Sequence, residues 1–404
     1  MTLASSSSVT LTGIEETVFG VTPVAGNPFT LRVTGETLDY TISKESSKEI
    51  NSNRTVASVI PTTASVTGNI SAEFSYSTFD TLLRSALQGA WVAFGTNGVG
   101  ASVTADFTTA TITAAVAPTG NNAFTLLQKG QFFSVGGVGL NSGKILRVSP
   151  VTAPTSTVIT LDPNTPAVAS TAESVTLSSS RLTHGTTQTS FSLQRRNQDV
   201  NVFTVYKGCT PSKFSLNVAS AALTSFTVDF MGKKAEADNV SLLPGVPTDP
   251  TSFEIHSGVF GATTAVWMNG APLTGTFIKS VALSYDNTLR SQEAIGTLGA
   301  VGIGSGTIAC TVTASIYFAD KTLFDKYVKN INTSLMFASS DAAGNGYMFS
   351  LPNSNITSFK SNASAKDQDQ MAEITFTVLE DRANLTPALR KLIFIDRFGT
   401  AVAP

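Results

Sequence analysis

The sequence has little charge for its length. Charged residues make up 13% of the 404 residues, about half the usual share, and the formal net charge is −2. This balance excludes a general basic surface for gripping nucleic acid. Hydrophobic residues reach 42%, so a disordered chain is excluded as well. A neutral surface rich in hydroxyl groups suits a protein that is covered by copies of itself.

Cysteine and histidine are equally scarce. Cys209 and Cys310 lie far apart and form neither a disulfide framework nor a metal-binding pair. The two histidines, His184 and His256, stand in no metal-ligand spacing. The stretch VGLNSGK (138–144) lacks the first glycine of a phosphate-binding loop. We therefore expect no enzyme, no metal and no cofactor.

Export signals and long apolar runs are also missing. The first residues, MTLASSSSVTLTG, have neither the basic nor the apolar part of a signal peptide. No apolar stretch is long enough to form a membrane-spanning helix. We expect a protein that is made and assembled in the cytoplasm of its host cell and has no membrane span.

Alternation of apolar and polar residues is the dominant pattern. It is clear in KFSLNVA (213–219), SFTVDFM (225–231), SVALSYD (280–286) and EITFTVL (373–379). This period of two predicts antiparallel sheets with one buried face. We expect an all-β protein with short flanking helices.

The strand pattern occurs twice. Three elements recur in the same order: an opening strand, a strand that runs into a short amphipathic helix, and a closing strand. The matching segments are 34–41 with 278–287, 69–87 with 311–329, and 225–235 with 373–383. This repeat indicates an internal duplication. The alternative is two unrelated β-domains that share common strand patterns.

The duplication defines the expected domains. The first covers residues 1–97 and 184–245, and the second covers 246–404. Residues 98–183 have no counterpart in the second half and contain short strands separated by Gly- and Pro-containing turns. We expect them to form a small inserted β-domain.

The polar sides of the repeated strands are the candidate functional surface. Their residues are Ser71, Glu73, Ser75, Thr227, Asp229, Thr311, Thr313, Ser315, Glu373, Thr375 and Thr377. None of them is a lysine or an arginine. An ordinary solvated sheet face is the alternative, but such faces commonly carry lysine. A surface that lets a polyanion slide past should avoid cations, because each phosphate contact adds affinity.

The segment 34–91 resembles the major tail tube proteins of long-tailed, siphovirus-like bacteriophages. The resemblance lies in the loop ESSKEINSNRTV (45–56) and in SVTGNISAEFSYSTFDTLLRSAL (65–87). Residues 13–23 and 204–235 also fit this family. The resemblance implies β-sandwich domains, six of which close a ring around a lumen. Stacked rings form the tube that conducts genomic DNA at infection.

Given the duplication, this resemblance implies three chains per ring. Two tandem β-sandwich domains of each chain would contribute strands to a shared inner β-barrel. The polar faces would line the lumen and let DNA pass without sequence-specific binding. The insert 98–183 would lie on the tube exterior, where it neither blocks the lumen nor separates rings.

The resemblance also implies partners and a location. The partners are other copies of the chain, a tape-measure protein, and tail tip and terminator proteins. The location is the phage tail in the virion. The loop over 42–61 carries both signs of charge, as a contact between stacked rings would. Its charged residues are Lys44, Glu45, Lys48, Glu49 and Arg54.

Two other classes of protein remain as alternatives. A secreted adhesin or pilus subunit is also β-rich, but it should carry a signal peptide. A carbohydrate-binding β-sandwich needs an exposed aromatic platform, whereas Trp91 and Trp267 lie far apart in the sequence.

Overall fold

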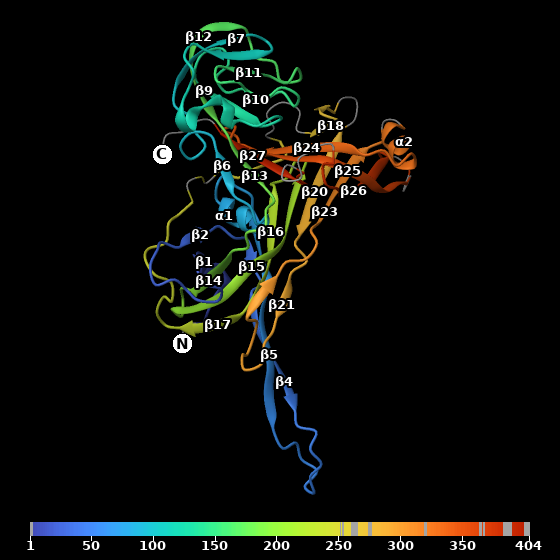
Figure 1. Cartoon of the computed structure of the whole chain (residues 1–404). Helices are drawn as coiled ribbons and strands as arrows, with labels where there is room; N and C mark the ends of the chain where they lie inside the picture. Colours follow the sequence, from blue (N-terminus) through green and yellow to red (C-terminus); the bar gives the residue numbers. More distant parts are fainter. Residues whose placement is uncertain are drawn as a thin grey trace.

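The computed structural model confirms an all-β protein, and the part of the chain that it describes contains two short α-helices (Figure 1). It describes residues 3–250, 252, 254–259, 266–273, 277–318, 321–362, 366, 368–382 and 390–399. The helices are α1 (Asp80–Ala86) and α2 (Thr322–Val328).

One antiparallel sheet of eight strands crosses both halves of the chain. Its neighbours, in spatial order, are β4 (Asp39–Ser46), β5 (Val59–Glu73), β16 (Ser225–Gly232), β15 (Val202–Ala219), β20 (Ile278–Asp286), β23 (Ala309–Tyr317), β26 (Met371–Val378) and β25 (Gly346–Asn362). The first four come from the first half of the chain and the last four from the second. We call this the inner sheet.

The internal duplication is visible in the pairing of these strands. Ala72 of β5 pairs with Phe226, and Ala314 of β23 pairs with Ile374. The offset in residue number from Ala72 to Ala314 equals the offset from the first residue of α1 to the first residue of α2. We call this the repeat offset. Both helices have the same length. The two halves therefore repeat the same strand order and the same strand-to-helix spacing.

Outer strands cover the apolar face of the inner sheet. In the first half they are β1 (Val9–Glu16), β2 (Phe29–Leu31), β14 (Ser190–Asn197) and β17 (Lys234–Asp238). In the second half they are β18 (Val266–Met268), β19 (Ala271–Pro272), β24 (Thr333–Ser340) and β27 (Phe394–Phe398). The long strands β15 and β25 belong to both layers, because their first parts pair with outer strands and their last parts with inner ones. Each half is thus a two-layered sandwich over one continuous core.

The junction between the halves is a continuous ladder of paired residues. It runs from Lys213 opposite Asp286 to Ala219 opposite Ser280. The halves also meet at α1, where Asp80 forms an ion pair with Arg397 of β27. The same carboxylate accepts a hydrogen bond of 2.7 Å from the hydroxyl of Tyr347. Backbone pairing and a buried polar cluster therefore fix the halves to each other.

The segment between β6 (Trp91–Ala93) and β13 (Ser180–Thr183) forms a separate six-stranded sheet. Its strands, in spatial order, are β10 (Ile145–Arg147), β9 (Phe132–Val138), β12 (Ser170–Ser178), β7 (Val103–Phe107), β8 (Thr111–Ala114) and β11 (Val158–Thr160). A bridge between Val148 and Leu161 joins the two ends, so the sheet closes into a small barrel with its own core. We call it the inserted barrel. Strand β13 itself pairs with β27 and β6, outside this barrel.

The inserted barrel packs against the outer layer of the second half. Phe132 lies in one apolar cluster with Trp267, Met336 and Met348. The neighbours of Met336, Leu335 and Phe337, belong to the central core instead. The barrel therefore covers the side of the outer layer that faces away from the inner sheet.

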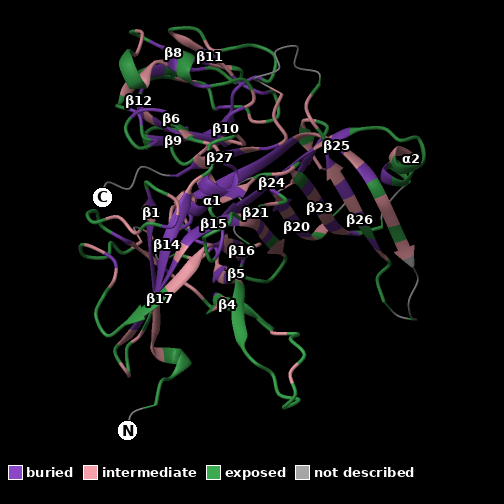
Figure 2. Ribbon diagram, turned by 60° about the horizontal axis from the view of Figure 1, so that its bottom comes forward, coloured by how far each residue is buried: buried purple, intermediate pink, exposed green. Residues whose placement is uncertain are grey.

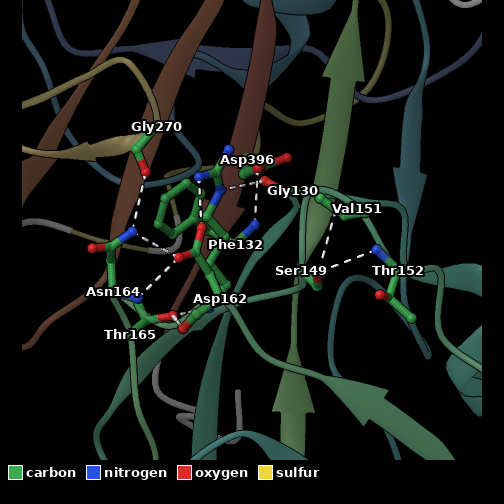
Figure 3. Close-up of polar contacts among 11 residues, drawn as sticks. Gly130, Phe132, Ser149, Val151, Thr152, Asp162, Asn164, Thr165, Gly270 and Asp396 are labelled. Carbon is green, nitrogen blue, oxygen red and sulfur yellow. Dashed lines mark hydrogen bonds and ion pairs between the residues drawn. The ribbon is translucent and has the colours of Figure 1, made fainter.

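Polar contacts fix the barrel in place (Figure 3). The backbone N–H of Phe132 donates to Asp396 of β27 at 3.0 Å, and Asn164 donates to the carbonyl of Gly270 at 3.3 Å. Asp396 also accepts two hydrogen bonds from Arg181, at 2.6 and 2.7 Å. A fully buried carboxylate is thus paired and hydrogen-bonded, as burial of a charge requires.

His256 connects the two halves and makes stability depend on pH. Its backbone N–H donates to Phe74 O, and its Nδ1 lies 3.1 Å from the hydroxyl of Ser339. Burial lowers the pKa of His256 to about 3, against about 6.5 in an unfolded chain. Between these values the unfolded state binds the proton more strongly. The contribution of the neutral ring is therefore complete above pH 6.5 and is lost as the pH falls toward 3.

We predict that the free energy of unfolding decreases by up to about 1.4 kcal/mol per pH unit below about pH 6.5 because of this one group. His256→Gln should remove that part of the slope between about pH 7 and pH 5, where most carboxylates stay ionised. Denaturant unfolding of both proteins at several pH values is the measurement. Equal slopes for the two proteins would contradict the assignment.

Candidate functional site: a polar sheet face, two open edges and an arm

The side of the inner sheet that faces away from the core is polar across all its strands. We call it the polar face. One row of cross-strand neighbours consists of Ser71, Thr227, Ser215, Ser284, Thr311, Thr377 and Asn355. The hydroxyls of Ser71 and Thr227 are 3.4 Å apart. A band of small, uncharged hydrogen-bonding groups therefore runs from β5 to β25.

The structure brings ten of the eleven predicted side chains together on this face. They are Ser71, Glu73, Thr227, Asp229, Thr311, Thr313, Ser315, Glu373, Thr375 and Thr377. All of them are half-buried or exposed, whereas the residues that alternate with them are buried. The alternation predicted from the sequence is thus the alternation of the sheet.

The prediction for Ser75 is wrong. Strand β5 ends at Glu73, and Ser75 is only 1% exposed. Its hydroxyl donates to Thr78 at 2.7 Å, and its backbone forms a bridge with Ile255. The alternating pattern continues in the sequence to Tyr76, but the chain leaves the sheet before it.

Two lysines that the sequence reasoning did not place also lie on the polar face. Lys213 of β15 is opposite Asp229 on one side and Asp286 on the other. Lys360 of β25 is opposite Glu373. Lys213 was detectable from its phase in KFSLNVA, but the bulge between Ile356 and Ser358 hides the phase of Lys360.

Each of these lysines is therefore balanced by carboxylates. Burial raises the pKa of Asp229, Lys213 opposes this shift, and the charge of Asp286 adds to it. The charged residues that the register places on the face are the carboxylates Asp39, Glu73, Asp229, Asp286 and Glu373 and the lysines Lys213 and Lys360. Five negative charges against two positive ones leave the face weakly negative.

The inner sheet has two open edges. In the part of the chain that the structure describes, β4 pairs with β5 alone, and the last part of β25 pairs with β26 alone. An edge strand presents unpaired backbone N–H and C=O groups that can pair with another chain. The two edges lie at opposite ends of the same sheet.

The hairpin of β4 and β5 extends beyond the body of the molecule as an arm (Figure 1). The predicted loop 42–61 is shorter than expected, because β4 continues to Ser46 and β5 begins at Val59. Lys44 and Glu45 therefore lie in β4, while Lys48, Glu49 and Arg54 lie in the connection.

All five charged residues of the arm are exposed (Figure 2). Apolar side chains of the arm are exposed with them: Ile50 is 100% exposed, Val56 64% and Ile60 59%. An arm with this much uncovered apolar surface is typical of a segment that contacts another molecule.

The described residues contain neither a cluster of metal-ligand side chains nor a helix that could span a membrane. Within them, no three His, Cys, Asp or Glu side chains gather closely enough to hold a metal ion. Their helices include none that is long and apolar enough to cross a membrane.

The model of a family described as phage tail tube protein matches residues 6–378. No curated protein matches the chain. The matched range includes both halves of the inner sheet, the arm and the inserted barrel.

Proposed function

Because the chain belongs to the phage tail tube protein family, we propose that it forms the DNA-conducting tube of a siphovirus-like tail as stacked rings of three chains. The observation that carries this proposal is the inner sheet, with one polar face, one buried face and two open edges. Its role in the virion is structural, and it assembles in the host cytoplasm. The tape-measure protein sets the tube length, and tip and terminator proteins bind at the two ends of the tube.

The strand pairing that joins the two halves of one chain predicts how neighbouring chains would pair. In the junction, the last part of β15 pairs with β20. The repeat makes β25 the equivalent of β15, and β4 the equivalent of β20. The open edge of β25 would therefore pair with the open edge of β4 in the next copy, and the last copy would pair with the first. Such closure removes the open edges of the inner sheets.

The number of strands sets the width of the channel. Three chains with eight inner strands each give a barrel of 24 strands. With about 4.8 Å between strands, its circumference is roughly 115 Å and its diameter roughly 37 Å before strand tilt widens it. Such a barrel admits a DNA duplex after the side chains are subtracted. Six chains would double the diameter and lose the close fit.

The polar face would line this channel. Its hydroxyl groups bind water and one another, and its net negative charge repels the phosphates of passing DNA. The two lysines are opposite carboxylates, so neither offers an isolated positive charge to a phosphate. The inserted barrel sits on the far side of the outer layer, which corresponds to the tube exterior.

The arm would connect successive rings. It continues the direction of β4 and β5 beyond the inner sheet, and its tip combines both signs of charge with exposed Ile50 and Val56. Burial of these apolar side chains in the next ring would supply affinity, and the charges would fix the orientation.

The first prediction concerns the number of chains. Native mass spectrometry of isolated rings, or image reconstruction of tubes, should give three chains per ring. Six chains per ring would overturn the closure argument, because twelve sandwiches would then surround the lumen.

The second prediction concerns the lumen wall. Ser71→Lys together with Thr313→Lys adds six positive charges to each ring of three chains. These charges recur in every ring, so weak phosphate contacts should add up to DNA that leaves slowly and in a salt-dependent way. Ejection kinetics of phage particles at two salt concentrations are the measurement.

A matched control places the same charge elsewhere. Val116→Lys together with Val138→Lys changes two residues of the inserted barrel that are 79% and 84% exposed. This variant should eject DNA at the normal rate. Normal ejection from assembled Ser71→Lys, Thr313→Lys tubes would mean that the polar face does not line the lumen.

The third prediction concerns the arm. Replacement of Lys48–Thr55 by Asn-Gly shortens the connection and should leave the fold intact, because these residues lie outside the strands. Rings should still form, but long tubes should not. Electron microscopy and thermal unfolding test both points. Tubes of normal length would remove the arm from the contact between rings.

A further inference from the structure

The two equivalent helices have different surroundings. The repeat offset relates Leu82 of α1 to Phe324 of α2. Leu82 is 1% exposed, whereas Phe324 is 45% exposed. Ala86 is 0% exposed, and its equivalent Val328 is 64% exposed. Equivalent side chains are thus buried on α1 and exposed on α2.

The second half of the same chain covers α1. The side-chain amide of Asn287 donates a hydrogen bond of 2.7 Å to the carbonyl of Ala86, at the end of the helix. Gln88 donates to the hydroxyl of Ser305, also at 2.7 Å. Asn287 directly follows β20, and Ser305 follows β22 (Gly302–Gly304). Helix α1 is therefore contacted by the residue that follows β20 and by the residue that follows β22.

The exposed side of α2 forms one apolar surface. We call it the α2 surface, and its residues are Phe318, Phe324, Tyr327, Val328 and Ile331. The rings of Phe318, Phe324 and Tyr327 all contact the ring of Phe359 in β25, at centroid distances of 5.5 to 6.4 Å. These five side chains are between 38% and 64% exposed. A contiguous apolar surface of this kind marks an interaction site.

The repeat identifies what should cover this surface. Asp286 is opposite Ala309 in β23, and Asp39 is opposite Thr67 in β5. Thr67 and Ala309 are again related by the repeat offset. The residue after Asp39, Tyr40, therefore holds the position of Asn287. In the first half of the chain, α1 is contacted by the side-chain amide of Asn287. The equivalent position that would contact α2 carries the aromatic side chain of Tyr40.

We propose that the α2 surface binds the base of the arm of a neighbouring copy, with Tyr40 of that copy against Val328. The proposal rests on the ring described above and assigns its side-chain contacts. A second copy fits because the open edge of β25 lies beside α2, as β15 lies beside α1. The contact that the chain makes with itself through Asn287 would be made between copies through Tyr40.

A cysteine pair tests this contact directly. In Tyr40→Cys, Val328→Cys, mild oxidation of assembled tubes should link chains into closed covalent trimers on a denaturing gel. Either substitution alone should give none, because native Cys209 and Cys310 are 0% and 2% exposed. If tubes of the double variant form normally but contain no covalently linked chains, the proposal is wrong.

Charge substitutions test how much the α2 surface contributes to the free energy of assembly. Phe324→Asp and Val328→Asp should raise the protein concentration required for ring and tube formation at least tenfold. Val138→Asp, on the inserted barrel, is the matched control and should change it little. Thermal unfolding of the unassembled proteins checks that each variant is folded. Tubes from Phe324→Asp at the normal concentration would overturn the proposal and leave the tube function intact. Wild-type protein that forms neither rings nor tubes would instead refute the tube function.

Discussion

The pairing of β15 with β20 is the contact on which the rest of the structure depends. It joins the inner strands of two sandwiches into one sheet, so that the apolar side chains of these strands face one core and the polar ones of the opposite face point away from it. A shift of one residue would turn one half over relative to the other. The stacked rings of Phe214 and Tyr285, 5.4 Å apart across this junction, favour the observed register. The open edges at β4 and β25 are a consequence of the same pairing.

This arrangement explains the low charge of the sequence. A sheet with one face in a core needs apolar residues there. In the proposed tube, the opposite face would carry polar groups that do not hold a polyanion. Serine and threonine meet the second demand, because they bind water and one another without a net charge. The inner and outer strands bury the apolar residues, and copies of the chain would cover much of what remains. On the polar face, the two lysines lie opposite carboxylates: Lys213 is opposite Asp229 and Asp286, and Lys360 is opposite Glu373.

Local alternation was enough to predict the polar side of the regular inner strands, and the repeat was enough to predict the same strand order in both halves. Alternation could not predict where a strand ends. Ser75 continues the pattern of β5 but lies beyond its end, where it is 1% exposed and its backbone bridges to Ile255. Nor could alternation predict strands that change partners. β15 leaves one layer and enters the other, and its partner β20 lies in the other half of the chain. Such pairings are fixed by tertiary packing, which period and propensity do not encode.

The proposed ring would account for the differences between the two repeats. The two strands of the junction within the chain belong to one molecule, so they meet at a high effective concentration. There, the end of α1 is contacted by a polar side chain, Asn287, which donates to the carbonyl of Ala86. In the proposed ring, the equivalent junction forms between separate molecules and must supply its own affinity. Larger side chains stand at its equivalent positions, with Val328 in place of Ala86 and the aromatic Tyr40 in place of Asn287. Duplication therefore allows one copy of a contact to serve folding, while the other is free to serve assembly.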